Sequence, residues 1–183
     1  RSCMARLRMM TLVLVPAFLL LLVSAAPAAS LFDAPRSYMV GFQPGKVALA
    51  DFDGDGVEDL VASSTDSFLS ILLGNGDGTF GPRVAFEAGL SPASVAVGDF
   101  DHDGNADIAA VDSYQDEVLV LQGNGDGTFL SKVACPVGDY PISIAAADLD
   151  GDGNDDLATA NGWGDCISVL LGNGNATFQP STD

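Results

Sequence analysis

An acidic loop pattern that occurs three times constrains this chain more than any other feature of its sequence. Residues 99–107 read D-F-D-H-D-G-N-A-D, with aspartates at loop positions 1, 3, 5 and 9 and Gly104 at position 6. The same arrangement recurs in residues 51–59 and 148–156, at offsets of 48 and 49 residues. Alternate side chains along a curled loop point toward one centre, and a glycine permits the sharp bend that closes it.

Carboxylate oxygens directed at one point favour a hard cation, above all calcium. The alternative is an acidic, solvated turn, but two unit charges ~4 Å apart repel by on the order of 4 kcal/mol at an effective dielectric of 20. The sequence therefore predicts about three Ca²⁺ ions. The predicted ligands occupy loop positions 1, 3, 5, 7 and 9: Asp51, Asp53, Asp55, Val57 and Asp59; Asp99, Asp101, Asp103, Asn105 and Asp107; Asp148, Asp150, Asp152, Asn154 and Asp156.

Other readings of the acidic loops fit less well. An EF-hand needs a carboxylate at position 12 and a following helix, but position 12 is Ala62, Ala110 or Thr159 and strand-like runs follow. The single histidine, His102, occupies position 4, where the other loops have glycine, so we expect it to be exposed and without a metal role. Because the loops account for the paired carboxylates, no acid–base pair remains and we expect no enzyme activity.

The composition places the chain among globular proteins and excludes one class of partner. Hydrophobic residues make up 48 % of the chain and charged residues 17 %, which is not typical of a disordered protein. The formal net charge of −18 argues against nucleic acid, whose phosphates would be repelled. Bound cations at the acidic loops would offset a large part of this charge.

Residues 1–29 resemble a secretory signal peptide. Three arginines precede an apolar run at residues 11–23, and Ala26-Pro27-Ala28 offers a cleavage site. The alternative is a membrane anchor, but Pro16 interrupts the run, which is short for a span of ~20 residues. We therefore expect a secreted or cell-surface protein with no membrane insertion after cleavage.

The mature chain retains two cysteines, because Cys3 lies in the predicted signal peptide. An exported protein permits a disulfide between Cys135 and Cys166. Two small buried thiols are the alternative. The sequence alone favours neither.

The repeat extends beyond the aspartates to a unit of about 49 residues. Each acidic loop is followed by two short β-rich runs and then by a glycine-rich turn, such as G-N-G-D-G-T-F at residues 74–80. Another short run, such as residues 94–100, leads into the next acidic loop. Four short strands without a helical pattern are typical of one propeller blade. The predicted fold is all-β, a partial β-propeller of three four-stranded blades at residues 45–92, 93–141 and 142–183.

Strand direction predicts where the loops lie and what the termini do. The acidic loops and glycine turns should share one end of each blade, with Tyr114 and Trp163 at the opposite end. Phe32, Gly41 and Pro44 repeat an F-x8-G-x2-P pattern, so residues 31–44 should form the outer strand of a preceding or closing blade. Three blades fall short of the usual four to eight, so we expect further blades outside this sequence.

Residues 92–111, P-A-S-V-A-V-G-D-F-D-H-D-G-N-A-D-I-A-A-V, and the V-L-Q-G-N-G-D-G-T-F at residues 120–129 resemble the FG-GAP/VCBS repeat family, the blades of integrin-alpha-like propellers. The resemblance covers essentially all of residues 31–183. It implies a calcium-binding, seven-bladed propeller in a secreted or surface protein. Members of the family serve in adhesion, as lectin-like modules, or attached to enzymes.

The sequence thus favours a secreted, calcium-binding propeller segment that acts as an extracellular binding or adhesion module for a protein or glycan. One alternative is a carbohydrate-binding propeller that uses Tyr114 and Trp163 as an aromatic platform. Another is a non-catalytic part of a larger secreted hydrolase or lyase.

Overall fold

The structure is a computed structural model that describes residues 34–130 and 132–181. The chain divides into two units, Arg1–Ser37 and Tyr38–Asp183. Residues 34–37, the described part of the first unit, contain neither helix nor strand. The predicted signal peptide lies outside the described residues. Within them, no helix has the length and apolar character that a membrane span requires.

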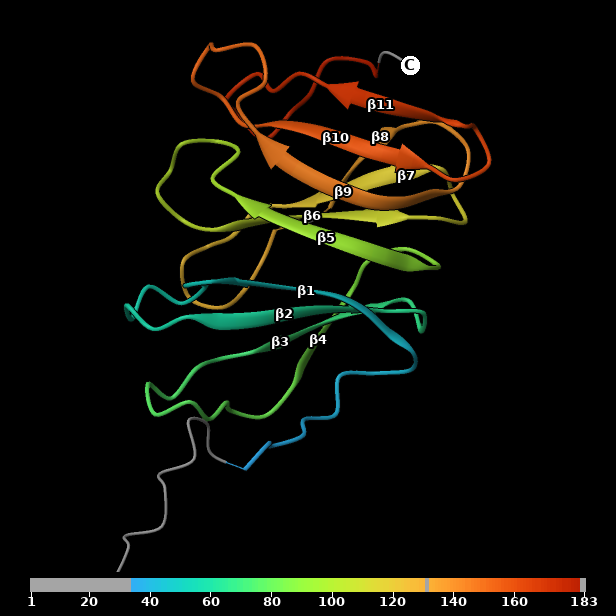
Figure 1. The fold of residues 1–183 in the computed structure, drawn as a ribbon. Helices are drawn as coiled ribbons and strands as arrows, with labels where there is room; N and C mark the ends of the chain where they lie inside the picture. The colour runs from blue at the N-terminus through green and yellow to red at the C-terminus, as the bar shows by residue number, and fades with distance from the viewer. Residues whose placement is uncertain (1–33, 131, 182–183) are drawn as a thin grey trace, which may run out of the picture. The chain divides into compact units, whose positions relative to one another are not determined.

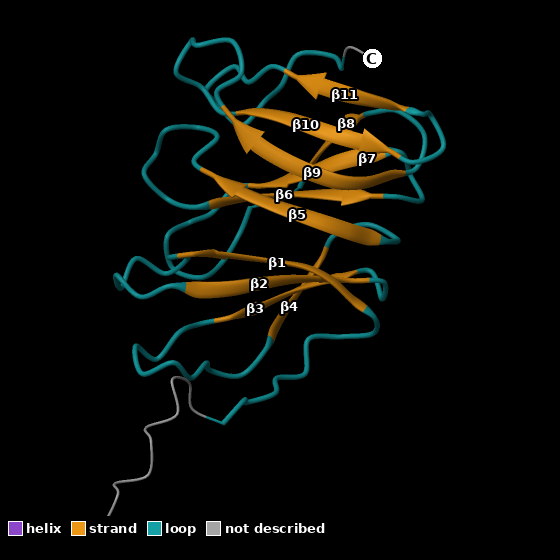
Figure 2. Cartoon of the chain, in the orientation of Figure 1, coloured by secondary structure: helices purple, strands orange, loops and turns teal. Residues whose placement is uncertain are grey.

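The described residues of the second unit form eleven strands in three antiparallel sheets (Figures 1 and 2). The first two sheets are four-stranded meanders in the order β1-β2-β3-β4 and β5-β6-β7-β8, and the third has the order β11-β10-β9. The strands are β1 Pro44–Ala50, β2 Asp59–Ser64, β3 Phe68–Leu72, β4 Val84–Glu87, β5 Pro92–Gly98, β6 Asp107–Asp112, β7 Glu117–Leu121, β8 Val133–Pro136, β9 Pro141–Ala147, β10 Asp156–Asn161 and β11 Cys166–Leu170. The predicted all-β arrangement of propeller-type blades is confirmed.

The central sheet is buried on both faces because its strands carry apolar or small side chains at successive positions. In β6, Ile108 and Ala110 belong to the core shared with the first sheet, whereas Ala109 and Val111 belong to the core shared with the third. All four are fully buried. Side chains alternate between the faces of a strand, so an unbroken apolar run covers both faces.

Matching aromatic pairs join neighbouring sheets beside the acidic loops. Phe52, at position 2 of the first acidic loop, meets Phe129 of the second glycine turn edge-on, with ring centroids 5.6 Å apart. Phe100 and Phe178 repeat this contact at 5.7 Å between the second and third sheets. The repeated sequence therefore produces a repeated interface.

A backbone hydrogen bond accompanies each aromatic pair. The amide of Gly127 donates to the carbonyl oxygen of Phe52 at 2.9 Å, and the amide of Ala176 donates to that of Phe100 at 2.8 Å. Gly127 and Ala176 are equivalent positions of successive glycine turns. The second and third glycine turns thus each hold the acidic loop of the preceding sheet.

Of the four strands predicted for the third sheet, three lie within the described residues. In the first two sheets the fourth strand begins four residues after the turn phenylalanine, at Val84 after Phe80 and at Val133 after Phe129. The equivalent position after Phe178 is residue 182, which lies outside the described residues.

The predicted outer strand at residues 31–44 is also not formed in its described part. Residues 34–43 contain no strand, and β1 begins at Pro44. Tyr38 packs edge-on against Phe80 with centroids 5.5 Å apart, and the Ser70 hydroxyl donates to the carbonyl oxygen of Val40 at 2.7 Å. Tyr38 and Val40 therefore pack on the first sheet, while a strand here would require a neighbouring strand to pair with it.

The structure does not join the two cysteines, so the disulfide that the sequence permitted is absent. Cys135 is buried on β8 in the core between the second and third sheets, and Cys166 opens β11 beside Asn161. Both thiols are free. Cys135 instead supplies small apolar volume to the core, as buried cysteines commonly do.

Candidate metal centres

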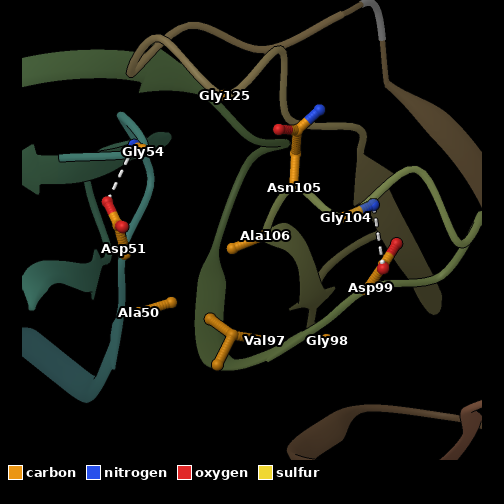
Figure 3. A pocket seen from close by; sticks show the side chains of 10 residues that line it. All are labelled: Ala50, Asp51, Gly54, Val97, Gly98, Asp99, Gly104, Asn105, Ala106 and Gly125. Atoms are coloured by element: carbon orange, nitrogen blue, oxygen red, sulfur yellow. Dashed lines mark hydrogen bonds between the residues drawn. The ribbon is translucent and has the colours of Figure 1, made fainter. Parts of the chain in front are cut away.

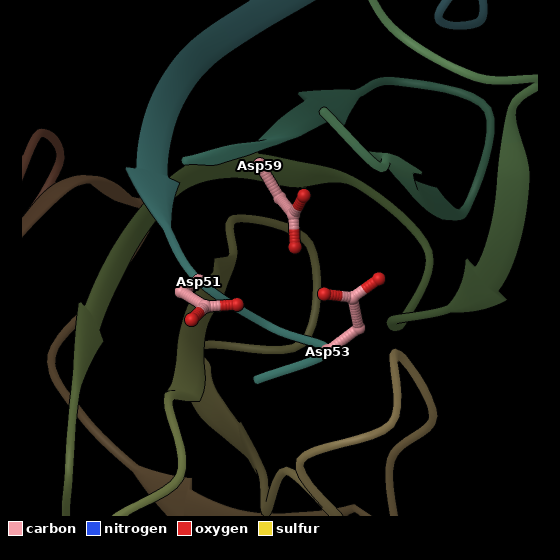
Figure 4. Close-up of side chains that lie close together, drawn as sticks. All are labelled: Asp51, Asp53 and Asp59. Carbon is pink, nitrogen blue, oxygen red and sulfur yellow. The ribbon is translucent and has the colours of Figure 1, made fainter. Parts of the chain in front are cut away.

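Each acidic loop joins the first two strands of its sheet and brings three carboxylates together. In the first loop, the carboxylates of Asp51, Asp53 and Asp59 each offer an oxygen, and these oxygens lie within 4.8 Å of one another (Figure 4). Figure 4 shows the three side chains pointing toward a common space inside the loop. These three aspartates occupy loop positions 1, 3 and 9 of the predicted ligand set.

The other two loops reproduce the cluster at the same positions. They are Asp99, Asp101 and Asp107, and Asp148, Asp150 and Asp156. Neighbouring carboxylates repel one another, so a cluster of three is unfavourable by itself. Its occurrence at the same positions in all three loops indicates that the cluster is a property of the repeat.

The aspartate at position 9 fixes the acidic loop to the glycine turn. Asp59 is 1 % exposed at the start of β2. Its Oδ2 accepts a hydrogen bond from the Phe52 amide at 2.8 Å, and its Oδ1 accepts one from the Gly74 amide at 2.7 Å. Asp107 and Asp156 make the two equivalent pairs of contacts. Acidic loop and glycine turn therefore share one end of each sheet, as predicted.

The first glycine of each turn is required by close approach of the backbone. A Cβ at Gly74 would lie 2.5 Å from the carbonyl oxygen of Glu58, which is closer than real Cβ atoms approach. Gly123 and Gly172 meet the carbonyl oxygens of Ala106 and Asp155 in the same way. Only glycine lets the turn come near enough to donate its amide to the position-9 aspartate.

The aspartate at position 1 curls the loop. Asp51 accepts hydrogen bonds from the Gly54 amide at Oδ1 (2.8 Å) and from the Gly56 amide at Oδ2 (2.9 Å). Asp148 does the same with Gly151 and Gly153. These local bonds hold the chain in the bend before any ion is considered.

Positions 5 and 7 are not part of the carboxylate clusters. The Oδ1 of Asp55 accepts a hydrogen bond from the Val57 amide at 2.8 Å, and Asp103 and Asp152 accept equivalent bonds from Asn105 and Asn154. The position-5 carboxylate thus faces its own backbone. A role for it, and for the position-7 carbonyl oxygen, stays a prediction.

Burial and like charges oppose ionisation within the clusters. Burial first, and then the charges of Asp101 and Asp103, raise the pKa of Asp107 to about 6, although hydrogen bonds from the amides of Gly123 and Phe100 lower it. Burial likewise raises the pKa of Asp53, and neighbouring aspartates add to the effect. A cation at the centre would offset this repulsion. An oxygen-only donor set therefore fits a hard metal ion.

The second loop has two further contacts that the sequence did not predict. Gln122 donates to Oδ2 of Asp101 at 2.6 Å. Nε2 of His102 lies 2.9 Å from Oδ1 of Asn154 in the third loop. His102 is exposed, as expected, but it connects two acidic loops and has a positive φ of 61°. The other two loops have glycine at this position, and that glycine could have predicted the positive φ.

A cavity of about 330 Å³ lies between the first two acidic loops (Figure 3). Its lining includes Asp51, Asp99 and Asn105 together with several glycines and small apolar residues. Figure 3 shows Asp51 and Asp99 each bonded to an amide of its own loop. The small residues leave this space open.

The two aromatic residues predicted as a binding platform do not form a pair. Tyr114 and Trp163 are each 75 % exposed and lie in equivalent turns of the second and third sheets. Trp163 stacks instead on Tyr140, with ring centroids 4.2 Å apart and planes 9° from parallel. Tyr140 was not among the predicted residues, because it directly precedes β9 and lies far from Trp163 in the chain.

Consecutive four-stranded sheets that carry an acidic loop and a glycine turn at one end define a repeat protein of the β-propeller class. The FG-GAP-like repeat matches residues 51–110 and 99–159 of this chain. The chain belongs to the FG-GAP-like repeat family. The matched residues contain all three acidic loops completely.

A solved structure provides a second comparison. It is a lectin from Agrocybe aegerita, described by its specific recognition of non-reducing terminal N-acetylglucosamine. The TM-score is 0.51 at 22 % identity, and the similarity covers 74 % of this chain and 37 % of the lectin chain. At this identity the likeness concerns the fold alone. No curated protein sequence matches this chain.

Proposed function

We propose that this chain is a secreted calcium-binding propeller module that acts by binding an extracellular partner and not by catalysis. The observation that carries the proposal is the threefold convergence of carboxylates at loop positions 1, 3 and 9. Calcium suits this set because it accepts six to eight oxygen ligands in flexible geometry, whereas magnesium demands a near-ideal octahedron. Membership of the FG-GAP-like repeat family supports the same assignment.

In this proposal calcium fixes the loops and stabilises the folded chain. An ion bound only by the folded state stabilises it by about 2.7 kcal/mol per site when its concentration is 100 times the dissociation constant. Each ion would hold the loop between the first two strands of a sheet. In the first two sheets that loop also contacts the neighbouring sheet, through Phe52 or Phe100.

Thermal unfolding tests this role. We expect a higher melting temperature in millimolar calcium than with a chelator, and a smaller rise in magnesium. Asp101→Asn should reduce the calcium-dependent rise, because it removes one charge from the second cluster. Tyr114→Phe, a change at an exposed residue far from the loops, is the matched control. Equal melting temperatures with calcium and chelator would contradict the proposal.

The sequence of the N-terminus supports export. Cleavage after residues 26–28 in secreted material would be detected by N-terminal sequencing. Retention of residues 1–29 in the mature protein would contradict secretion through this segment.

A second candidate function is binding of a glycan at the opposite end of the sheets. The stacked pair of Tyr140 and Trp163 favours it, because the exposed indole offers a flat apolar face to a sugar ring. Titration with N-acetylglucosamine-terminated oligosaccharides, followed by tryptophan fluorescence, is the test. Trp163→Ala should abolish binding and Tyr114→Ala should preserve it. No fluorescence change with any glycan would exclude this candidate.

A further inference from the structure

Within the described part of the chain, a side-chain hydrogen bond joins the second and third acidic loops, and no equivalent bond joins the first and second. Nε2 of His102, at position 4 of the second loop, lies 2.9 Å from Oδ1 of Asn154, at position 7 of the third. The equivalent residues of the preceding pair of loops are Gly54 and Asn105, which lie on two sides of the cavity between those loops (Figure 3). Gly54 has no side chain with which to reach Asn105.

The other hydrogen bonds of Asn154 define which atom donates to which. Nδ2 of Asn154 donates to Oδ2 of Asp152 at 2.8 Å. Only the amide nitrogen can donate to a carboxylate, so the amide oxygen faces His102 and Nε2 of His102 is the donor. The backbone amide of Asn154 also donates to Oδ1 of Asp152, at 2.8 Å. His102 therefore holds a residue whose remaining bonds are made to a predicted ligand of the third loop.

On its own loop, His102 lies between two aspartates of the predicted ligand set. Asp101, directly before it, belongs to the second carboxylate cluster and accepts a hydrogen bond from Gln122 at 2.6 Å. Asp103 follows directly after it. An ion held by Asp101 would therefore also order the backbone from which the imidazole of His102 extends.

The third glycine turn leaves the space in which the two side chains meet. A Cβ at Gly174 would collide with Oδ1 of Asn154 and would lie 3.3 Å from Cδ2 of His102. Gly125 of the second turn is equally close to Oδ1 of Asn105, but the residue across from it in the first loop is Gly54. The two pairs of loops thus have the same geometry and differ at position 4.

The remaining contacts between successive sheets at this end are common to both pairs. The carbonyl oxygen of Phe52 accepts a hydrogen bond from Gly127, as that of Phe100 does from Ala176. Both phenylalanines also pack edge-on against the phenylalanine of the next glycine turn. Any influence that passes through these contacts should be similar in the two pairs, so a difference between the pairs reports on His102.

We propose that calcium binding at the second loop and calcium binding at the third loop are positively coupled through His102 and Asn154. The first loop lacks this link. The inference rests on the proposed calcium binding, and His102 acts in it as a positioning residue and not as a ligand. An ion at Asp101 keeps the imidazole against Asn154, so the third loop has less conformational freedom to lose when it binds its own ion. Coupling of binding is reciprocal, so an ion in the third loop favours the second loop by the same factor.

Amide NMR of the isotope-labelled chain during a calcium titration measures each loop separately. Gly56, Gly104 and Gly153 occupy position 6 of the three loops, and each donates its amide to the aspartate at position 1 of its own loop. Asp101→Asn weakens the second site, and it should lower the calcium affinity reported by Gly153 by about fivefold or more. In a chain that also carries His102→Gly, Asp101→Asn should no longer change the affinity at Gly153.

His102→Gly suits this test because it introduces the residue that the other two loops have at position 4, and the positive φ is then unstrained. Dispersed amide signals would verify that the variant is folded. A merely structural role of His102 would lower the stability of the chain, but it would not remove the dependence of the third site on Asp101.

Asp53→Asn is the matched control for loss of charge. It removes one charge from the first cluster, but Gly54 makes no side-chain contact with the second loop, so the affinity at Gly104 should change by less than about twofold at physiological salt. A third site that does not depend on Asp101, or that depends on it equally in the His102→Gly chain, would overturn the coupling and leave calcium binding intact. If none of the three glycines responded to calcium, the proposed calcium binding would be wrong, and the coupling with it.

Discussion

The aspartates of one acidic loop have different structural roles, although their spacing in the sequence does not distinguish them. Asp59 and its counterparts are buried and bonded to two amides, Asp51 bends the loop, and Asp55 faces its own backbone. Spacing alone predicts that aspartates gather. It does not say which oxygens are committed to the backbone, because that depends on the approach of a glycine turn 15 residues away.

Asp107→Ala should destabilise the chain even without metal. The substitution leaves the amides of Phe100 and Gly123 without their acceptor, at a cost of about 2–4 kcal/mol. Urea denaturation in the presence of a chelator measures this. Asp103→Ala, which affects amides at the exposed tip of the loop, should cost less than about 1 kcal/mol. Equal losses would show that Asp107 has no structural role beyond its charge.

His102 allows a comparison of backbone strain with hydrogen bonding. Its φ is 61°, and the equivalent Gly54 and Gly151 also have positive φ. We expect His102→Ala to be less stable than His102→Gly by about 1 kcal/mol, because only glycine adopts this conformation without penalty. Both variants lose the contact with Asn154, so their difference in free energy of unfolding reports the strain alone. If the alanine variant were as stable as the glycine variant, the positive φ would be wrong.

The two cysteines should behave as separate thiols with different reactivity. Burial raises the pKa of Cys135, and the charge of Glu117 adds to the effect. At neutral pH the thiolate fraction of Cys135 is therefore lower than usual, and it grows as the pH rises toward the raised pKa. Reaction with a thiol reagent under native conditions should modify the half-buried Cys166 first and Cys135 more slowly, with a rate that increases with pH. If the thiols reacted only after a reductant was added, the two cysteines would be joined in a disulfide, and their assignment as free thiols would be wrong.

At the scale of elements, the sequence predicted the strands well wherever the repeat was complete. The two β-rich runs expected after each acidic loop are β2 and β3, β6 and β7, and β10 and β11. The outer strands at the two ends of the repeat array differ in their outcome. Residues 34–43 contain no strand, because a strand needs a neighbouring strand to pair with and none of the described strands pairs with them. The fourth strand of the third sheet stays a prediction, because its expected start lies outside the described residues. The Tyr140–Trp163 stack was missed because no periodic pattern links two turns.

The glycine turns should tolerate substitution very unevenly. Gly74→Ala places a Cβ against the carbonyl oxygen of Glu58 and separates the turn from Asp59, so we expect a loss of about 2 kcal/mol or more. Gly81→Ala, in the segment that follows the same turn, meets nothing closer than 3.5 Å and should change stability by no more than about 0.5 kcal/mol. Thermal or urea denaturation compares the two. A harmless Gly74→Ala would contradict the close approach of turn and acidic loop.

At the scale of the whole molecule, the candidate metal sites and the packing of the sheets depend on the same loops. Phe52 and Phe100 lie in the sequence between the clustered aspartates, and they contact the next sheet through both ring and backbone. An ion that orders an acidic loop therefore also orders the surface on which the neighbouring glycine turn rests. Metal binding at an acidic loop and the packing of the next sheet on that loop should therefore be coupled.

The stoichiometry of calcium binding tests the central claim most directly. Calorimetric titration of the chain with calcium should give about three ions per chain, with dissociation constants on the order of 10⁻⁴–10⁻³ M as in other extracellular modules. Replacing Asp53, Asp101 and Asp150 together by Asn should remove this binding, and each single replacement should remove about one ion. Full calcium binding by the triple variant, or no binding by the wild-type chain, would contradict the assignment of the acidic loops as calcium sites.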